Sequence, residues 1–193
     1  MAHASEIITP TGKNARPASG PQQDDIAVVP DGALAVERGT ILQIGASSQI
    51  LSQYRSRCLI DATRKTVLPG LVDPHTHLVY AGSREREFEM RIAGKSYMEI
   101  LAAGGGILST VAETRKTAKH RLIEICHARA NSLLVHGTTT IEVKSGYGLS
   151  EEEEIKCLQV ARSLHKTGPF HVVPTFLGAN AIPREYEGRT DEY

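Results

Sequence analysis

Residues 68–78 read LPGLVDPHTHL, an apolar run that ends in two histidines separated by one threonine. The segment from Leu71 to His77 has the length and the apolar content of a buried strand, and a Pro-Gly pair precedes it. Because side chains two residues apart point to the same face of a strand, His75 and His77 should project together. The sequence therefore predicts two neighbouring imidazoles at the carboxyl end of a rigid strand.

A pair of imidazoles is a fragment of a metal site. Imidazole is a common ligand of zinc and iron, and a catalytic site normally takes three or four protein ligands while keeping one position open. His75 and His77 would supply half of that shell. An isolated HxH pattern is more often a pair of surface or core histidines than a metal site. The carboxyl end of a strand, however, is where α/β barrels and open sheets place their active sites.

Composition limits the possible classes of protein. The chain has 193 residues with 40% hydrophobic content, which suits one domain, or one and part of another. Its 22 basic and 22 acidic residues cancel, so we expect a small-molecule substrate and no nucleic-acid or membrane partner. No signal-peptide core or membrane-spanning run is visible, which favours a cytoplasmic protein. Three scattered cysteines without a CxxC motif indicate neither a disulfide framework nor a thiolate metal site.

The pattern of apolar and turn-forming residues changes near residue 65. Residues 1–65 alternate short apolar runs with turn signals and predict a β-rich portion. Val36–Ile44 should form a hairpin closed at Arg38 and Gly39, and Pro30–Gly32 should be a turn. Residues 11–24 are polar and rich in glycine and proline, so we expect a mobile loop there.

Residues 66–193 alternate strands with helices. Strands are predicted at 71–77, 139–144 and 171–177, and helices at 119–136 and from Ser150 to Gly168. Ser150 and Glu153 have the spacing of a capping box. Strand, helix, strand, helix, strand is the pattern of a parallel sheet with crossover helices, either open or closed into a barrel.

Longer motifs indicate a family. VLPGLVDPHTH resembles the first barrel strand of the amidohydrolase superfamily. HTHLVYAGSREREFEMRIAGKSYMEI, GGGILSTVAETR, HGTTTIEVKSGYGL and VVPTFLGANAIP resemble the imidazolonepropionase family over nearly the whole chain. The resemblance implies an α/β fold, namely the amino-terminal part of a metal-dependent hydrolase (β/α)8 TIM barrel preceded by a small β-sandwich portion. It also implies hydrolysis of the ring amide of 4-imidazolone-5-propanoate to N-formimidoyl-L-glutamate in histidine degradation, with one divalent metal, zinc or iron.

The same resemblance implies site residues. His75 and His77 match the first two metal ligands of the family, and the ion would activate water and polarise the ring carbonyl. Arg84 matches a substrate-binding arginine that could clamp the propanoate carboxylate in a bidentate way. Tyr147 matches another substrate contact, and Tyr97 could also face the ligand. Without the family, the arginine would be a solvated side chain and the two tyrosines packing residues.

One residue departs from the family pattern. Asn180 stands where the family has a histidine that contacts substrate. Asparagine can donate and accept hydrogen bonds, but it cannot become a cation near neutral pH. A relative that acts on a different cyclic amide is therefore an alternative.

The number of residues is also short for a complete barrel. About 128 residues follow the β-rich portion, against roughly 250 for a typical barrel, and three strands cannot close. The remaining metal ligands and the catalytic acid and base of the family would lie beyond this half. We therefore expect no catalytic residue in this half and no activity of the chain alone, although a full-length form could be an active homodimer. A non-catalytic truncated remnant is the other alternative.

Overall fold

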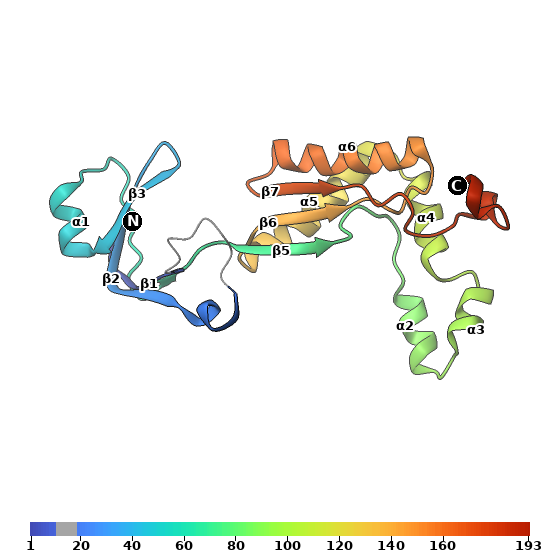
Figure 1. Cartoon of the computed structure of the whole chain (residues 1–193), viewed down its shortest axis with the longest axis horizontal. Helices are drawn as coiled ribbons and strands as arrows, with labels where there is room; N and C mark the ends of the chain where they lie inside the picture. The colour runs from blue at the N-terminus through green and yellow to red at the C-terminus, as the bar shows by residue number, and fades with distance from the viewer. Residues whose placement is uncertain (11–18) are drawn as a thin grey trace. The chain divides into compact units, whose positions relative to one another are not determined.

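The computed structural model describes residues 1–10 and 19–193, which divide into two compact units, Met1–Pro69 and Gly70–Tyr193 (Figure 1). Thr66–Val67 forms strand β4 and pairs with the first sheet, so the first unit extends a few residues beyond the predicted change at 65. Residues 11–18 of the predicted loop lie outside the described residues. In the last part of the predicted loop, Gly20–Asp24 forms the 3-10 helix η1.

The first unit is built on a mixed sheet of four strands in the order β3-β2-β1-β4. Its remaining strands are β1 (Ala4–Pro10), β2 (Ile26–Glu37) and β3 (Thr40–Ala46), followed by helix α1 (Ser47–Gln53). β2 pairs antiparallel with both β1 and β3, whereas β4 runs parallel to β1. Small buried clusters, one of Ala2, Ala33 and Ile50 and one of Ala4, Ile7 and Ala62, fill its interior.

The turn predictions for this unit had opposite outcomes. The hairpin is confirmed: β2 and β3 are joined at Arg38 and Gly39, whose φ angles of 51° and 80° are the two positive values that a type I′ turn requires. The predicted turn at Pro30–Gly32 is wrong, because β2 runs through it without a break. Asp31 has a positive φ of 42°, and near it the strand changes partner from β1 to β3. The turn residues mark a bend inside one strand.

The second unit contains a parallel sheet in the order β5-β6-β7. The strands are β5 (Leu71–Thr76), β6 (Thr138–Lys144) and β7 (His171–Thr175), which confirms the three predicted strands. Seven further segments are helical: α2 (Glu85–Ile92), α3 (Tyr97–Ala102), α4 (Ile107–Lys116), α5 (Lys119–Val135), α6 (Glu151–Thr167), η2 (Arg184–Tyr186) and η3 (Thr190–Glu192). No helix in the described part of the chain is long and apolar enough to cross a membrane.

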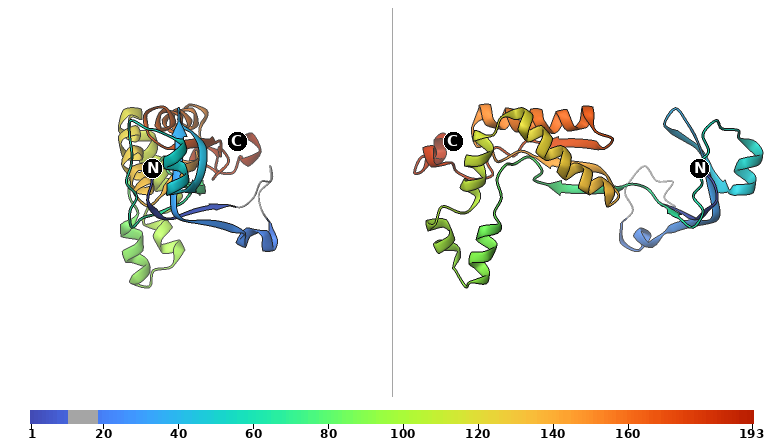
Figure 2. Two further views of the ribbon diagram at one scale, coloured as in Figure 1. Left: turned by 90° about the vertical axis from the view of Figure 1, so that its left-hand side faces the viewer. Right: turned by 180° about the vertical axis from the view of Figure 1, so that it is seen from behind.

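Helices α5 and α6 cover one face of this sheet, as Figures 1 and 2 show. The strand residues on that face are buried against them, including Ile141, Val143 and Val172. Alternate residues face the other way, and Val72 and Val173 are exposed there. The sheet therefore has a closed face, packed by α5 and α6, and an open face.

The predicted cap at the start of α6 differs from the structure. Ser150 precedes α6, but its side chain makes no capping hydrogen bond, so the predicted capping box is wrong. The complete capping box in the structure lies at Ser96 and Glu99, at the start of α3. Four glutamates, Glu151 to Glu154, load the first turn of α6 and interact favourably with its dipole.

Candidate active site

The two predicted metal ligands lie together at the carboxyl end of β5. His75 is the penultimate residue of the strand and His77 follows it directly. Their ring centroids are 5.5 Å apart, with an angle of 54° between the ring planes. The structure thus brings the two imidazoles close enough to share one ion.

The chemistry of His77 fits a metal ligand. Its Nδ1 atom is buried and has no hydrogen-bond partner among the residues that the structure describes, which is unusual for a buried polar atom. Burial, with repulsion from His75 and Lys144, lowers the pKa of His77. The ring is then neutral at pH 7 and offers a lone pair. No group of three or more His, Cys, Asp or Glu within residues 1–10 and 19–193 could hold a metal, so the pair alone would be an incomplete shell.

A cavity of about 440 Å³ adjoins His77. Tyr147 forms one wall, with its ring centroid 5.5 Å from that of His77 and 5.9 Å from that of Tyr80. Tyr80 is fixed in turn by Arg129, whose guanidinium lies 3.5 Å from the centre of its ring. Burial raises the pKa of Tyr147, so its hydroxyl keeps its proton at neutral pH. The residues that line the cavity are His77, Tyr80, Ser83, Arg84, Glu85, Thr110 and Tyr147.

Arg84 lines the cavity, but one of its edges is occupied. Its Nε donates to Glu87 Oε1 over 2.8 Å and its Nη2 donates to Glu87 Oε2 over 2.6 Å. This hydrogen bonding raises the pKa of Arg84 and lowers that of Glu87. A guanidinium has a second fork, between Nη1 and Nη2, and only this fork could receive a substrate carboxylate in a bidentate way.

Glu87 also orders the glycine run that follows α3. Its Oε1 accepts a hydrogen bond of 2.8 Å from the backbone N–H of Gly106, which has a φ of 85° and caps α4. One buried carboxylate therefore ties the Arg84 loop to the start of α4. This role could not be predicted from a local pattern, because it depends on a contact between residues 19 positions apart.

A charged pair near the two histidines was also missed. Glu142 and Lys144 of β6 form an ion pair, and both side chains are largely shielded from solvent. Burial raises the pKa of Glu142, but hydrogen bonds from Lys144 and Thr175 outweigh it and lower the pKa overall. The signal was present in TTIEVK, where charged residues alternate with the buried Ile141 and Val143.

The other two predicted site residues have different surroundings. Asn180 donates through its side-chain amide to the carbonyl of Gly146 over 2.9 Å, so it contacts the backbone of the loop that carries Tyr147. Tyr97 begins α3 and is 57% exposed. It does not line the cavity.

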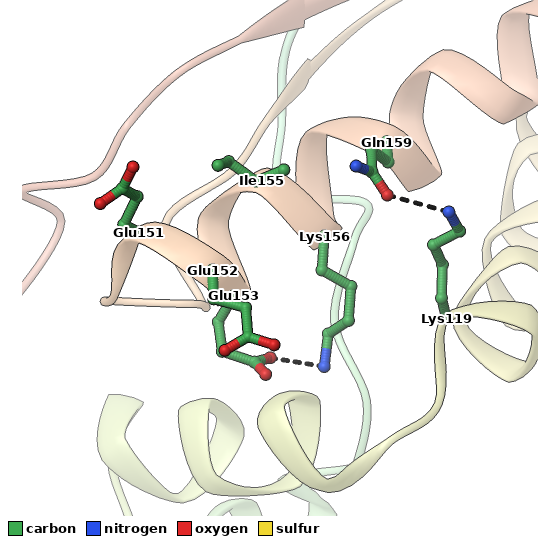
Figure 3. Close-up of a pocket in the computed structure, with 7 residues that line it drawn as sticks. All are labelled: Lys119, Glu151, Glu152, Glu153, Ile155, Lys156 and Gln159. Atoms are coloured by element: carbon green, nitrogen blue, oxygen red, sulfur yellow. Dashed lines mark hydrogen bonds and ion pairs between the residues drawn. The ribbon is translucent and has the colours of Figure 1, made fainter.

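A second cavity, of about 630 Å³, is lined by residues of α6 and by Lys119, the first residue of α5 (Figure 3). Four of its polar side chains pair with one another: Lys119 donates to Gln159 over 2.9 Å, and Lys156 forms an ion pair with Glu153. It contains none of the predicted site residues. The cavity beside His77 is therefore the candidate active site.

Comparison with known proteins supports the resemblance found in the motifs. Imidazolonepropionase of Geobacillus kaustophilus is 46% identical over 98% of this chain, and the match covers 46% of that relative. Imidazolonepropionase of Brevibacillus brevis is 44% identical over 99% of this chain and 46% of its own length. The chain thus spans about half the length of the curated relatives it matches, which is consistent with an amino-terminal half. No family model matches.

Among solved structures, Escherichia coli guanine deaminase superposes on 90% of this chain and 35% of its own, with a TM-score of 0.57 and 17% identity. At that identity the likeness concerns the fold alone. The α/β arrangement described above therefore also occurs in guanine deaminase.

Proposed function

We propose that this chain is the amino-terminal half of an imidazolonepropionase, a metal-dependent hydrolase of the cytoplasm that opens the ring amide of 4-imidazolone-5-propanoate to give N-formimidoyl-L-glutamate. The observation that carries the proposal is the His75–His77 pair, with the unpartnered Nδ1 of His77, beside Tyr147 and Arg84. In this proposal the first unit contributes to a small β-sandwich. The sheet β5-β6-β7 is the first part of a (β/α)8 barrel whose remaining strands would cover its open face.

His75 and His77 would hold one zinc or iron ion, which when bound would supply activation of water and polarisation of the ring carbonyl. The chain's contribution is to present both rings from one rigid strand end. The low pKa of His77 keeps its nitrogen lone pair available. Further ligands and the group that moves protons would come from the other half of the barrel.

Arg84 and Tyr147 would bind and orient the substrate. The free fork of Arg84 suits the propanoate carboxylate, while Glu87 holds the other fork and so fixes the direction of the guanidinium. Tyr147 presents a protonated hydroxyl and a ring beside His77. The carboxylate and the ring amide would thus be held at opposite ends of one cavity.

Asn180 favours a second candidate, a hydrolase of another cyclic amide. Its side-chain amide is directed to Gly146, and a neutral amide here cannot supply the positive charge that a histidine could. Dihydroorotate and hydantoin are the substrates with which this candidate would be tested.

The experiment compares this chain with a polypeptide that continues it through a complete barrel. We expect the long protein, loaded with zinc or iron, to hydrolyse imidazolone propanoate, and the 193-residue chain to be inactive. Arg84→Gln should lower kcat/KM by roughly a hundredfold, because a charge-assisted bidentate contact is lost. Arg86→Gln, an exposed neighbour, is the matched control.

Each outcome discriminates between the candidates. Turnover by the 193-residue chain alone would overturn the half-site assignment. Preference for dihydroorotate or hydantoin would favour the second candidate. A complete barrel that binds metal but hydrolyses none of the three would support a non-catalytic remnant.

A further inference from the structure

The loop from Ser145 to Leu149, called here the Tyr147 loop, is bound through its backbone N–H groups by one carboxylate. Glu154 of α6 is 3% exposed. Its side chain accepts hydrogen bonds from the N–H groups of Gly146 at 2.9 Å, Gly148 at 2.7 Å and Leu149 at 2.8 Å. Three charge-assisted bonds to one buried carboxylate leave the loop little freedom.

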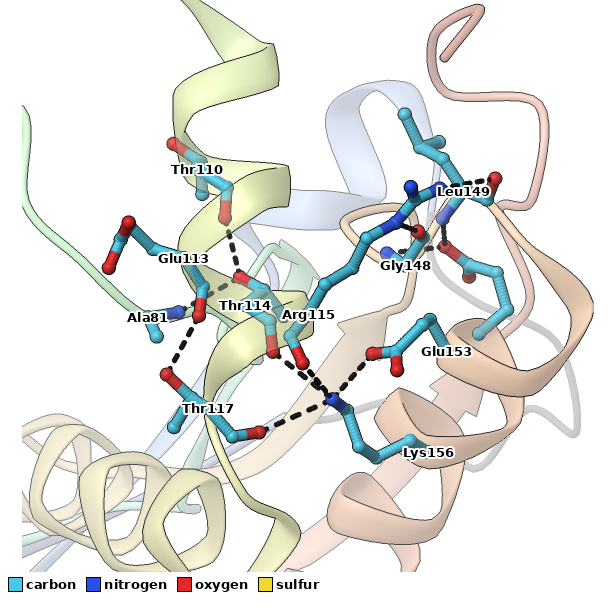
Figure 4. A network of polar contacts seen from close by, with 11 residues as sticks. Ala81, Thr110, Glu113, Thr114, Arg115, Thr117, Gly148, Leu149, Glu153 and Lys156 are labelled. Atoms are coloured by element: carbon cyan, nitrogen blue, oxygen red, sulfur yellow. Dashed lines mark hydrogen bonds and ion pairs between the residues drawn. The ribbon is translucent and has the colours of Figure 1, made fainter. Parts of the chain in front are cut away.

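The carbonyl groups of the same loop are bound by a cation from another helix. Arg115 of α4 donates through Nε to the carbonyl of Gly148 over 2.6 Å and through Nη2 to that of Leu149 over 2.8 Å. It also pairs with Glu185 over 2.8 Å. Figure 4 shows Arg115 reaching the loop across the space between α4 and α6.

The two helices that supply these groups are themselves tied together. Lys156 of α6 donates to the carbonyls of Thr114, Arg115 and Thr117 at 3.0 to 3.2 Å (Figure 4). These carbonyls lie at the C-terminal end of α4, where a cation is favoured by the helix dipole. Arg115 and Glu154 are therefore held at a fixed separation.

The loop itself has a backbone that needs such support. Leu149 has a φ of 52° and Gly146 a φ of 106°. A positive φ is unfavourable for leucine, and such residues persist where the surroundings over-determine them. The contacts with Glu154 and Arg115, together with the hydrogen bond from Asn180 to the carbonyl of Gly146, hold the backbone that carries Tyr147.

We infer that Glu154 and Arg115 are positioning residues, which act through the Tyr147 loop to hold the Tyr147 ring against His77. That the ring then meets a substrate rests on the proposed function. The placement of the ring, 5.5 Å from His77, is a property of this chain and can be tested without activity.

The first test measures amide hydrogen exchange in the 193-residue chain. Glu154→Gln keeps one acceptor oxygen but turns an NH2 group toward a loop N–H. We expect the amides of Gly146, Gly148 and Leu149 to exchange about tenfold faster. Glu152→Gln, which removes the same charge at an exposed position of the same turn, should leave their exchange unchanged. Unchanged exchange in Glu154→Gln would overturn the inference.

The second test measures ring placement by NMR in the same variants. The nuclear Overhauser effect between the Tyr147 and His77 rings should weaken in Glu154→Gln and in Arg115→Gln, and persist in Glu152→Gln. Far-UV circular dichroism establishes that each variant is folded. A general structural role would lower stability without weakening this ring contact, so a persistent contact in folded variants contradicts the inference.

The third test uses the polypeptide with a complete barrel. Glu154→Gln should raise KM roughly tenfold with a smaller change in kcat. In a Tyr147→Phe background the same substitution should have a smaller effect, because the two residues act in series. Fully additive effects would contradict positioning through Tyr147. An inactive parent protein would overturn the proposed function instead, while the exchange and NMR results would still decide the placement.

Discussion

The two faces of the sheet β5-β6-β7 are made by the same strands but differ in the side chains that they carry. On the closed face Ile141, Val143 and Val172 are buried against α5 and α6. On β6 the alternate residues Glu142 and Lys144 form an ion pair near the two histidines. The period of two in a strand separates a face that stabilises the fold from a face that carries chemical groups.

The two faces should contribute differently to the free energy of unfolding. Apolar side chains at positions 142 and 144 would stabilise the fold at least as well as the ion pair. The reason is that the loss of hydration of two shielded charges offsets much of the attraction between them. Residues on the closed face should therefore dominate the free energy of unfolding, and residues on the open face should dominate binding. The predictions below are ordered by the size of the effect expected on that contrast.

The largest effect should come from neighbouring valines of β7. Val172 is 4% exposed on the closed face, whereas Val173 is 45% exposed. Val172→Ala should lower the free energy of unfolding by about 2 kcal/mol, and Val173→Ala by less than about 0.5 kcal/mol. Urea denaturation of the two variants provides the measurement, with each the control for the other. Equal losses would show that both faces are packed.

A smaller effect is expected on the stability of the fold at acidic pH, through Glu87. Hydrogen bonds from Arg84 lower the pKa of Glu87 below its usual value of 4.5. Its contribution to stability is then fully present above pH 4.5 and is lost as the pH falls toward the folded pKa. Glu87→Gln should cost about 1 kcal/mol at pH 7 and should lose less stability than the parent on acidification.

Glu89→Gln is the matched control, because it removes an exposed carboxylate from the same helix. Stability of Glu87→Gln and Glu89→Gln would be measured by urea denaturation from pH 7 to pH 3. Parallel pH profiles for the parent and Glu87→Gln would contradict the assignment.

The smallest effect is a difference in the reactivity of the three cysteine thiols in the folded chain. Cys126 and Cys157 lie in the core beneath the closed face, and burial raises their pKa values to about 11 and about 12. Cys58, in the first unit, is exposed. At pH 8 a thiol reagent such as Ellman's should modify Cys58 quickly and the other two only after denaturant is added. Fast labelling of all three in the folded chain would contradict a closed core.

Local patterns explain how much could be predicted from the sequence. The three strands, α5, α6 and the Arg38–Gly39 hairpin were predictable because hydrophobic period and turn chemistry are properties of short segments. That the rings of His75 and His77 lie close together was predictable from strand geometry. The family motifs indicated the surrounding residues without giving their contacts.

The contacts between distant segments were not predictable. Glu154 lies in a run of four glutamates, and nothing in that run distinguishes the one that binds the Tyr147 loop from those that face solvent. The contact of Glu87 with Gly106 spans 19 positions and was missed for this reason, whereas its pairing with Arg84 lies within one helical turn. Ser150 was expected to cap α6 from its spacing alone, and the structure shows no capping bond from its side chain.

Metal binding by the two histidines tests the central claim most directly. Calorimetric titration of the 193-residue chain with zinc should give a dissociation constant in the micromolar range or weaker, since half the ligand shell is present. His75→Ala and His77→Ala should each weaken it by more than about tenfold, while His120→Ala, an exposed control on α5, should not. Zinc binding that is unchanged by loss of His75 or His77 would contradict the account.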